Sequence, residues 1–380
     1  MSTNRNSLIT ALAGLLLAAC SNEPQPLAPD SAFGLSASAA GEAGPGAVYL
    51  MSNATAGNEV IVFDRAADGA LAAAGTHATG GTGTGGGLGN QAGVVLSRDH
   101  RHLYVVNAGS DDVSAFAVGR DGLQLIGSPV PSGGEEPISV AAHRDLLYVL
   151  NAGDGGNISG FRIGVAGDLT PIPGSMRPLS SGTAGPAQIG FSPNGRVLVV
   201  SEKATNTLSS YSVSSDGLAS GPIPNASAGA TPFGFNFNQR GDLVVSEAFG
   251  GAPGASTASS YRVGGDGALQ LVSGTVATTQ TAACWIAIGQ NGKFAYTTNT
   301  GSGTISSLAI GPGGTLALSE AVAGTGIAPL DAAFTPGGRF LYVRNGGGNV
   351  GAFRVEANGG LTHLGDFGQL PAGTNGLATR

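Results

Sequence analysis

The feature of this chain that most restricts its fold is a pattern that recurs roughly every 45 residues. A short apolar strand ends in asparagine or glutamate, as in LYVVN, LYVLN, LVVSE and AYTTN. Repeats of about 40–50 residues are typical of propeller blades. The pattern therefore restricts the fold of nearly the whole chain, because its closing residue recurs at positions 107, 151, 202, 247, 299 and 345.

Each repeat contains four short strands joined by turns. In one copy the apolar strand 197–202 is followed by the alternating strand LSSYSV at 208–213 and by an Asp216-Gly217 turn. Glycine, asparagine and aspartate supply the positive φ angles that tight hairpin turns require. The 66 glycines, which follow no G-X-Y period, therefore indicate an all-β protein with many turns.

Six copies of the repeat are complete and the first is not. The copy at 46–83 begins at its second strand, and a spare strand lies around 376–379. Pairing of these two ends would close a ring without an exposed sheet edge. The sequence thus predicts a seven-bladed β-propeller over 46–380, with four-stranded blades and a ring closed by the C-terminal strand. A flat solenoid is the alternative, and it would need caps at both ends.

The first 19 residues are typical of a signal peptide. Arg5 gives a positive start, and residues 8–19 form an apolar run too short for a stable membrane-spanning helix. The run ends in LAAC, which resembles the lipobox of bacterial lipoproteins. We therefore expect lipidation of Cys20, a flexible tether over 20–45, and a location in the cell envelope, on the outer membrane or facing the periplasm. An ordinary secretory signal with a chance cysteine is the alternative.

The charge of the chain bears on its partners. The formal net charge is −7, and only two lysines, Lys203 and Lys293, are present. Nucleic-acid binding needs a basic face, so this class of partner is disfavoured. We expect contact with the membrane through the lipid anchor only. A closed propeller needs no second chain to complete its core, so we expect a monomer.

Three motifs resemble those of a known family. PAQIGFSPNGRVLV at 186–199, TPGGRFLYV at 335–343 and VSAFAVGRDGL at 113–123 are similar to blades of the β-propeller lactonases. That family includes 6-phosphogluconolactonase-like and carboxymuconate cyclase-like propellers, and its blade is shared with YVTN-repeat surface propellers. The resemblance covers nearly the whole chain after the signal. It implies a lactonase, which hydrolyses a cyclic ester, or a lactonizing cyclase.

The chain departs from this family at one type of position. Lactonase-type members carry a histidine after the proline that opens the first strand of a blade. The five histidines of this chain lie elsewhere, in turns and at strand ends, and none occupies the matching positions Ser139, Gln188, Gly234, Ile286 and Asp331. The acid–base histidine of the family is therefore missing.

The candidate site is expected on one face of the ring. The ends of the second strands and the starts of the first strands meet on the same face of a propeller, around the central channel. We expect that face to hold catalytic Glu202, Glu247 and Arg344. Expected binding residues there are Gln188, Asp331 and Trp285, with the amides Asn107, Asn151, Asn299 and Asn345.

Two copies replace the strand-ending asparagine with glutamate. Asparagine caps its own loop readily, whereas glutamate does not, so Glu202 and Glu247 suggest another role. Close carboxylates separate their pKa values and can act as an acid–base pair. Coordination of Ca²⁺ is a second possibility. A purely structural role, with each carboxylate held by a backbone N–H or an arginine, is the third.

Several further residues have two interpretations. Arg344 replaces an apolar or small residue, and it can clamp a substrate carboxylate or pair with Glu202, Glu247 or Asp331. Trp285, the single tryptophan, packs between blades or forms the floor of a ligand pocket. The segment GTGTGGGLG at 81–89 lacks the helix and acidic residue of a dinucleotide site, so we interpret it as a flexible loop between blades.

Two functions from different classes fit these observations. The first is a lactonase-like envelope propeller that hydrolyses or forms a lactone at the channel face, with no cofactor or, less favoured, Ca²⁺. Its ligand would be a small-molecule lactone or a carbohydrate. The alternative is a non-catalytic propeller that binds a glycan or an envelope protein. The missing histidine and the many neutral amides favour the second, whereas the family resemblance and the two glutamates favour the first.

Overall fold

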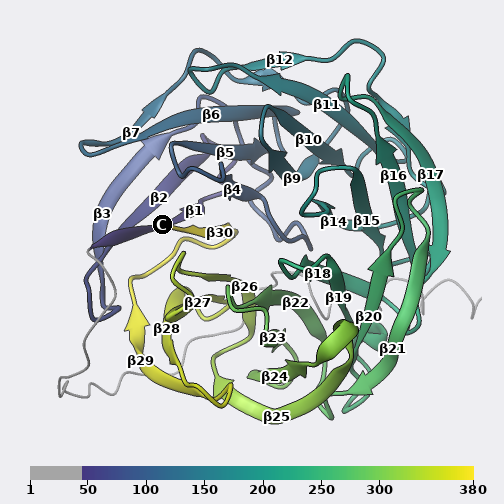
Figure 1. Cartoon of the computed structure of the whole chain (residues 1–380). Coiled ribbons are helices and arrows are strands. Elements are labelled where there is room, and N and C mark those ends of the chain that lie inside the picture. The colour runs from purple at the N-terminus through teal and green to yellow at the C-terminus, as the bar shows by residue number, and fades with distance from the viewer. Residues whose placement is uncertain (1–44) are drawn as a thin grey trace, which may run out of the picture.

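A ring of seven antiparallel sheets surrounds a central channel (Figure 1). The computed structural model describes residues 45–380; the expected signal peptide, Cys20 and nearly all of the expected tether lie outside the described residues. Each sheet consists of four main strands, and the chain passes from one blade to the next in sequence order. The predicted seven-bladed β-propeller is confirmed.

The strands of the first three blades follow the chain from its first described residues. They are β1 (Gly46–Met51), β2 (Glu59–Arg65) and β3 (Leu71–Ala78); β4 (Val94–Leu96), β5 (His102–Asn107), β6 (Asp112–Gly119), β7 (Gly122–Leu125) and β8 (Val130–Pro131); and β9 (Pro137–His143), β10 (Leu146–Asn151), β11 (Asn157–Ile163), β12 (Leu169–Pro171) and β13 (Arg177–Pro178). The two-residue strands β8 and β13 pair with the third strands β6 and β11 of their blades.

The other four blades each have four strands. They are β14 (Pro186–Phe191), β15 (Val197–Glu202), β16 (Thr207–Val213) and β17 (Ala219–Ala226); β18 (Pro232–Phe237), β19 (Asp242–Glu247), β20 (Thr257–Val263) and β21 (Leu269–Ala277); β22 (Ala283–Ile288), β23 (Phe294–Asn299), β24 (Thr304–Ile310) and β25 (Leu316–Thr325); and β26 (Pro329–Phe334), β27 (Phe340–Asn345), β28 (Asn349–Val355) and β29 (Leu361–Phe367). Two short 3₁₀ turns occupy Phe249–Gly251 and Pro312–Gly314.

The last strand closes the ring. β30 (Asn375–Thr379) pairs antiparallel with β1, with Val48 opposite Thr379 and Met51 opposite Asn375. It thereby becomes the innermost strand of the first blade, as the sequence predicted. Figure 1 shows β30 beside β1, where the two ends of the described chain meet.

The second strand of each blade carries most of the core. All six residues of β10, β15, β19 and β27 are buried, because these strands are covered on both faces by neighbouring blades. Strands buried on both faces have continuous apolar sequences, which explains LYVL and LVVS. Tyrosines of these strands also bond between blades: Tyr148 Oη donates to Gly217 O at 2.7 Å, and Tyr342 Oη donates to Gly69 O at 2.8 Å.

The first strand of most blades contains a β-bulge near its start. In the last blade Pro329 pairs with Asn345 and Ala332 pairs with Val343, so Leu330 and Asp331 lie opposite Arg344 alone. Bulges re-aim side chains and are frequent next to functional sites. This bulge places Asp331 at the wall of the central channel.

Candidate active site in the central channel

One end of the channel is closed by the chain itself. Residues 88–92, which we call the channel plug, enter from the first blade and precede β4 in the second. Gln91 N donates to Ala187 O at 3.1 Å, and Trp285 Nε1 donates to Asn90 O at 2.6 Å. The plug thus contacts the first strands of the fourth and sixth blades near their starts, on the two sides of the fifth blade.

The side chain of Lys203 also holds the plug in place. Lys203 Nζ donates to Gly89 O at 2.6 Å and to Pro186 O at 3.0 Å, and it lies 4.8 Å from the centroid of the Phe233 ring. Burial lowers the pKa of Lys203 to about 8. Two carbonyls and an aromatic ring therefore hold the ammonium group of Lys203.

The glycine-rich segment at 81–89 also differs from its prediction. It lies between blades and residues 84–87 are exposed, as expected of a loop. However, Gly83 N donates to Ala54 O and Gly85 N donates to Asn53 O, both at 2.8 Å. Leu88 is buried. The segment is therefore bonded to the first blade and leads into the plug.

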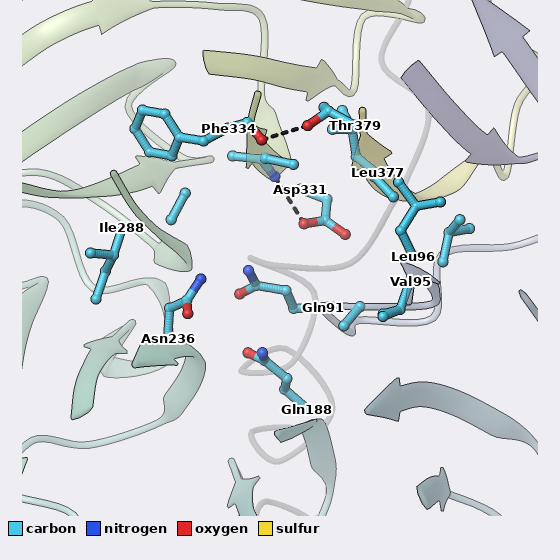
Figure 2. Close-up of a pocket in the computed structure, with 16 residues that line it drawn as sticks. Gln91, Val95, Leu96, Gln188, Asn236, Ile288, Asp331, Phe334, Leu377 and Thr379 are labelled. Atoms are coloured by element: carbon cyan, nitrogen blue, oxygen red, sulfur yellow. Dashed lines mark hydrogen bonds between the residues drawn. The ribbon is translucent and has the colours of Figure 1, made fainter. Parts of the chain in front are cut away.

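Beyond the plug lies a cavity of about 330 Å³. Its buried end is formed by Gln91, Gln188 and Asp331, each less than 8% exposed. Its walls follow the first strands towards their last residues, where Leu96, Ile288 and Phe334 are half-buried and Asn236 is exposed. The lining thus runs from buried residues beside the plug to more exposed residues at the far end of the first strands, and Figure 2 shows these side chains around the cavity.

Asp331 is the one titratable group that lines this cavity. Its Oδ1 accepts a hydrogen bond from Ala332 N at 2.8 Å, whereas Oδ2 is buried and has no hydrogen-bond partner among residues 45–380. Burial raises the pKa of Asp331 to about 7, although the Ala332 N–H, the charge of Arg344 and the nearby N–H groups of Ala92 and Leu377 act in the opposite direction. Figure 2 shows the carboxylate between Gln91 and Leu377. A carboxyl group with this pKa can take up and release a proton near neutral pH.

Arg344 lies behind Asp331, in β27, and does not line the cavity. It is 5% exposed. Burial lowers its pKa to about 9, and the charge of Asp331 opposes that shift. Arg344 and Asp331 thus influence each other electrostatically, in the direction expected of the pairing that was one of the two alternatives. Arg344 itself is not among the residues that line the cavity.

Two glutamine amides complete the buried end, and both bond to backbone of another blade. Gln188 Nε2 donates to Phe235 O at 3.0 Å while its Oε1 accepts from Phe235 N at 2.7 Å. Gln91 makes the same pair of bonds with Ile286, at 2.8 and 3.2 Å. Gln188 thus links the first strands of the fourth and fifth blades, and Gln91 links the plug to the first strand of the sixth blade. They shape the cavity rather than offer an unpaired amide to it.

The mouth of the cavity holds one exposed amide. Asn236 Oδ1 accepts a hydrogen bond from Phe237 N at 2.8 Å, which leaves the amide nitrogen to solvent. Thr379, also in the lining, donates its hydroxyl to Phe334 O. Asn236 is therefore the second polar group, after Asp331, that can bond directly to a ligand in this cavity.

The two glutamates lie away from the cavity, in separate hydrogen-bond networks. Glu202 is fully buried and accepts bonds from Ser180 N at 3.1 Å, Ser209 Oγ at 2.6 Å, Thr205 Oγ1 at 3.1 Å and the Ser180 hydroxyl. Neither glutamate contributes to the cavity lining. The contacts of Glu202 are those of the structural role that the sequence left open.

Glu247 is arranged in the same way one blade further on. It accepts bonds from Gly229 N at 2.8 Å and from the hydroxyl groups of Thr257 and Ser227. Each glutamate therefore joins the end of its own second strand to the tail of the preceding blade. The structure does not bring the two carboxylates together as an acid–base pair in the cavity.

The four asparagines of the same slot act similarly. Asn107 Nδ2 donates to Asp112 Oδ1 at 2.6 Å and to Ser114 Oγ at 2.8 Å, while its Oδ1 accepts from Asn58 Nδ2 at 2.8 Å. Asn151, Asn299 and Asn345 bond to the first residue of their third strands, at 2.8 to 3.1 Å. None of the four lines the cavity. The side-chain nitrogens on the face predicted to hold the ligand are thus engaged in structural hydrogen bonds, while Oδ1 of Asn151, Asn299 and Asn345 has no partner among residues 45–380.

Trp285 has the packing role that was one of its two interpretations. It is 3% exposed and packs on Phe233 with ring centroids 4.9 Å apart. Its indole N–H bonds to the plug, so it stabilises the closed end of the channel without lining the cavity.

Gln91 and Asn236 were missed by the sequence analysis. Gln91 follows a loop that carries no recognisable motif, and its position in the channel depends on long-range bonds to the sixth blade. Asn236 lies near the end of β18, two residues beyond Gly234, which is the position compared with the family histidine in that blade. A comparison of strand ends would have found it. Gln188 and Asp331, both predicted, are brought together in the cavity.

Residues 45–380 contain no cluster of three or more His, Cys, Asp or Glu side chains arranged to hold a metal ion. In the same range no helix has the length and apolar character needed to cross a membrane.

These observations define a class: a closed seven-bladed propeller with a blind channel cavity and a buried carboxyl group at its inner end. The family model for the seven-bladed β-propeller lactonases matches residues 47–177, 171–276 and 255–375. The chain therefore belongs to the seven-bladed β-propeller lactonase family. The resemblance inferred from the blade motifs is confirmed.

Solved structures support the fold. A proposed 6-phosphogluconolactonase from Bacteroides fragilis is 22% identical, with a TM-score of 0.69 over 88% of this chain and 98% of its own. The periplasmic gluconolactonase of Pseudomonas aeruginosa is 18% identical, with a TM-score of 0.69 over 88% and 99%. A Lactobacillus plantarum protein is 18% identical, with a TM-score of 0.70 over the same shares. No curated protein is similar enough in sequence to count as a match.

Proposed function

We propose that this protein hydrolyses a lactone in the channel cavity, with Asp331 as the general base. The observation that carries the proposal is the buried Oδ2 of Asp331, which has no partner among the described residues and lies at the blind end of a cavity. Membership of the lactonase family supports the reaction class. The reported names of the P. aeruginosa and B. fragilis neighbours are consistent with it.

The position of Asp331 supports its role. Asp331 occupies one of the positions that match the family's histidine, two residues after the proline that opens the first strand. A histidine there would titrate near pH 6.5. Burial raises the pKa of Asp331 to about 7, so the carboxyl group would serve the same purpose in the same place.

The proposed reaction proceeds in two proton transfers. The Asp331 carboxylate removes a proton from water as the water oxygen attacks the lactone carbonyl carbon. The tetrahedral intermediate then expels the ring oxygen, and the Asp331 carboxyl group returns the proton to that oxygen, which gives a hydroxy acid. The amide nitrogen of Asn236 is the donor at the cavity mouth that can bond to the substrate carbonyl. The positive charge of Arg344 stabilises the carboxylate form of Asp331.

The setting of the protein is part of the proposal and rests on the sequence. LAAC at 17–20 supports lipidation of Cys20 and a location in the cell envelope. Closure of the propeller by β30 supports a monomer, because the inner edge of β1 is paired within the same chain and needs no second chain. The proposed chemistry uses water and side chains, so we expect no cofactor.

The test is hydrolysis of a panel of lactones by the propeller domain, residues 46–380, produced without the signal peptide. Proton release in weak buffer measures the rate. We expect Asp331→Asn to lower kcat by about 100- to 10,000-fold, which is the usual contribution of a general base. Asp121→Asn, on an exposed turn, is the matched control and should keep the wild-type rate. Circular dichroism would establish that each variant is folded.

A second variant separates this site from the one suggested by sequence. Loss of turnover in a Glu202→Gln/Glu247→Gln protein, with Asp331→Asn active, would transfer catalysis to the glutamates and overturn the proposal. Absence of turnover in the folded wild type on every lactone would favour the non-catalytic alternative, in which the propeller binds a glycan or an envelope protein.

A further inference from the structure

Most of the residues that line the cavity have apolar side chains, and none of them has a cationic side chain. Of the residues that line it, Gln91, Gln188, Asn236, Asp331 and Thr379 are polar, and the others are alanine, valine, leucine, isoleucine and phenylalanine. No lysine, arginine or histidine is among the lining residues. Arg344, whose charge lowers the pKa of Asp331, is buried and is not one of the lining residues.

A phosphorylated substrate does not fit this lining. Phosphate groups are held in proteins by arginine, lysine or the N-terminus of a helix. The two 3₁₀ turns of residues 45–380 lie outside the lining, so no helix supplies such a terminus. The one charge that faces the cavity, Asp331, is of the same sign as phosphate once it loses its proton. Like charges in a poorly hydrated site disfavour binding.

A substrate with many hydroxyl groups is also poorly matched. Sugar hydroxyls need several donors and acceptors, because a buried polar group without a partner is costly. Gln91 and Gln188 have both their oxygen and nitrogen bonded to backbone, and the Thr379 hydroxyl donates to Phe334 O. Among the lining side chains, only Asp331 and Asn236 remain to bond a ligand, which is enough for one ester group.

The size of the cavity sets a further limit. Small-molecule pockets span about 300–1,000 Å³. At about 330 Å³ this cavity is at the small end of that range, and the plug prevents a ligand from extending through the ring. A single lactone ring with a short substituent fits, whereas an oligosaccharide would project from the mouth. Ile288, Phe334 and Leu96 would surround an alkyl substituent near that mouth (Figure 2).

We infer that the cavity selects uncharged lactones with an apolar substituent over phosphorylated and polyhydroxylated sugar lactones. The inference rests on the proposed function for its chemistry, but the selectivity itself follows from the lining. The ester group would face Asp331 and Asn236, and the substituent would contact the apolar walls.

The experiment compares three substrates with the same soluble domain at pH 7.5. They are δ-octalactone, which is uncharged with an alkyl chain, glucono-δ-lactone, which is uncharged and polyhydroxylated, and 6-phosphogluconolactone, which is anionic. We expect kcat/KM for δ-octalactone to exceed both others by about tenfold or more, because each methylene group in an apolar pocket contributes roughly that factor. A higher value for either sugar lactone would overturn the inference and leave the proposed hydrolysis intact.

A variant at the mouth tests the electrostatic argument. Asn236→Lys places a cation at an exposed position of the lining, so we expect the ratio of kcat/KM for 6-phosphogluconolactone to that for δ-octalactone to rise several-fold. Asn236→Gln is the uncharged control and should leave this ratio near the wild-type value. An unchanged ratio in the lysine variant would contradict the inference.

Binding without turnover distinguishes the two proposals. The ring-matched lactam of δ-octalactone resists hydrolysis, and its binding is measured by calorimetry beside that of 6-phosphogluconate. Tighter binding of the lactam, weakened by Ile288→Asp, would support the selectivity even if no lactone were hydrolysed. Tighter binding of 6-phosphogluconate, or binding of neither compound, would overturn it.

Discussion

At the residue scale, the exchange of asparagine for glutamate in two blades is explained by reach. The short side chain of Asn107 is sufficient, because the side chain of Asn58 in the first blade extends to it and donates to its Oδ1. Glu202 instead reaches a backbone N–H, that of Ser180, and Glu247 reaches the N–H of Gly229. The extra methylene group of glutamate spans that distance. The substitution therefore preserves the joint between blades rather than creating a chemical site.

Glu202→Ala should destabilise the domain strongly. It would leave the Ser180 N–H and the hydroxyl groups of Ser180, Thr205 and Ser209 without their acceptor, at about 1–3 kcal/mol for each group left buried and unsatisfied. Glu202→Gln keeps one acceptor oxygen and should cost less. Urea unfolding curves would measure both changes. Equal stability of the alanine variant and the wild type would contradict the structural role.

Asp331 should make stability depend on pH. Its folded-state pKa, about 7, exceeds the unfolded value of 3.8, so between these values the folded protein holds a proton that the unfolded chain has lost. The free energy of unfolding should therefore fall as pH rises from about 4 to about 7, by up to roughly 1.4 kcal/mol per pH unit from this group.

Asp331→Asn removes that group and should flatten the curve over the same pH range. Asp112 and Glu136, whose pKa values are also raised by burial, are present in both proteins and cancel in the comparison. Urea unfolding at several pH values between 4 and 8 measures the difference. Parallel curves for the two proteins would show that the Asp331 carboxyl group does not titrate in this range.

At the element scale, the channel plug and the bulge in β26 together make the site. The plug closes one end of the channel through bonds to the fourth and sixth blades. The bulge turns Asp331 into the cavity opposite Arg344. The plug depends on contacts between residues far apart in the chain, whereas the bulge forms within the β26–β27 hairpin.

Loss of the plug contacts should be visible by fluorescence. Gln91→Ala removes two hydrogen bonds to Ile286, and Trp285, the single tryptophan, bonds to the adjacent Asn90. We expect a red shift of the tryptophan emission and a lower Tm, because water would reach a side chain that is now 3% exposed. Gln124→Ala, at an exposed position in β7, is the matched control. An emission maximum equal to that of the control would argue against the plug.

The sequence predicted these elements unevenly. Strand order, blade number and ring closure followed from the repeat, because periodic apolar strands and glycine turns act locally. Gln188 and Asp331 were found by their place after a blade-opening proline. The plug was interpreted as a loop, since its bonds to Ala187, Ile286 and Trp285 join segments about 100 or 195 residues away. Such contacts leave no periodic signal.

At the scale of the whole molecule, one strand determines whether the ring is closed. β30 supplies the inner strand of the first blade, and Arg380 exchanges two backbone hydrogen bonds with Ala47. It also contributes Leu377, Ala378 and Thr379 to the cavity. Pairing of β30 with β1 therefore both closes the ring and completes the wall of the cavity.

Deletion of residues 375–380 should lower stability and abolish activity together. The inner edge of β1 would lose its partner, and the cavity would lose one wall. We expect a fall in Tm of more than about 10 °C, because several buried residues and backbone hydrogen bonds are lost at once. Differential scanning calorimetry of the truncated and complete domains measures it. A truncated protein with unchanged Tm would show that the ring does not depend on β30.

The most direct test of the account is the pH dependence of kcat/KM for lactone hydrolysis, corrected for the spontaneous reaction. The account predicts that kcat/KM rises with pH and levels off above an apparent pKa of about 7, the value for Asp331, and that Asp331→Asn loses both the rate and this transition. A transition that persists in Asp331→Asn, or a variant as active as the wild type, would contradict the assignment of Asp331 as the general base.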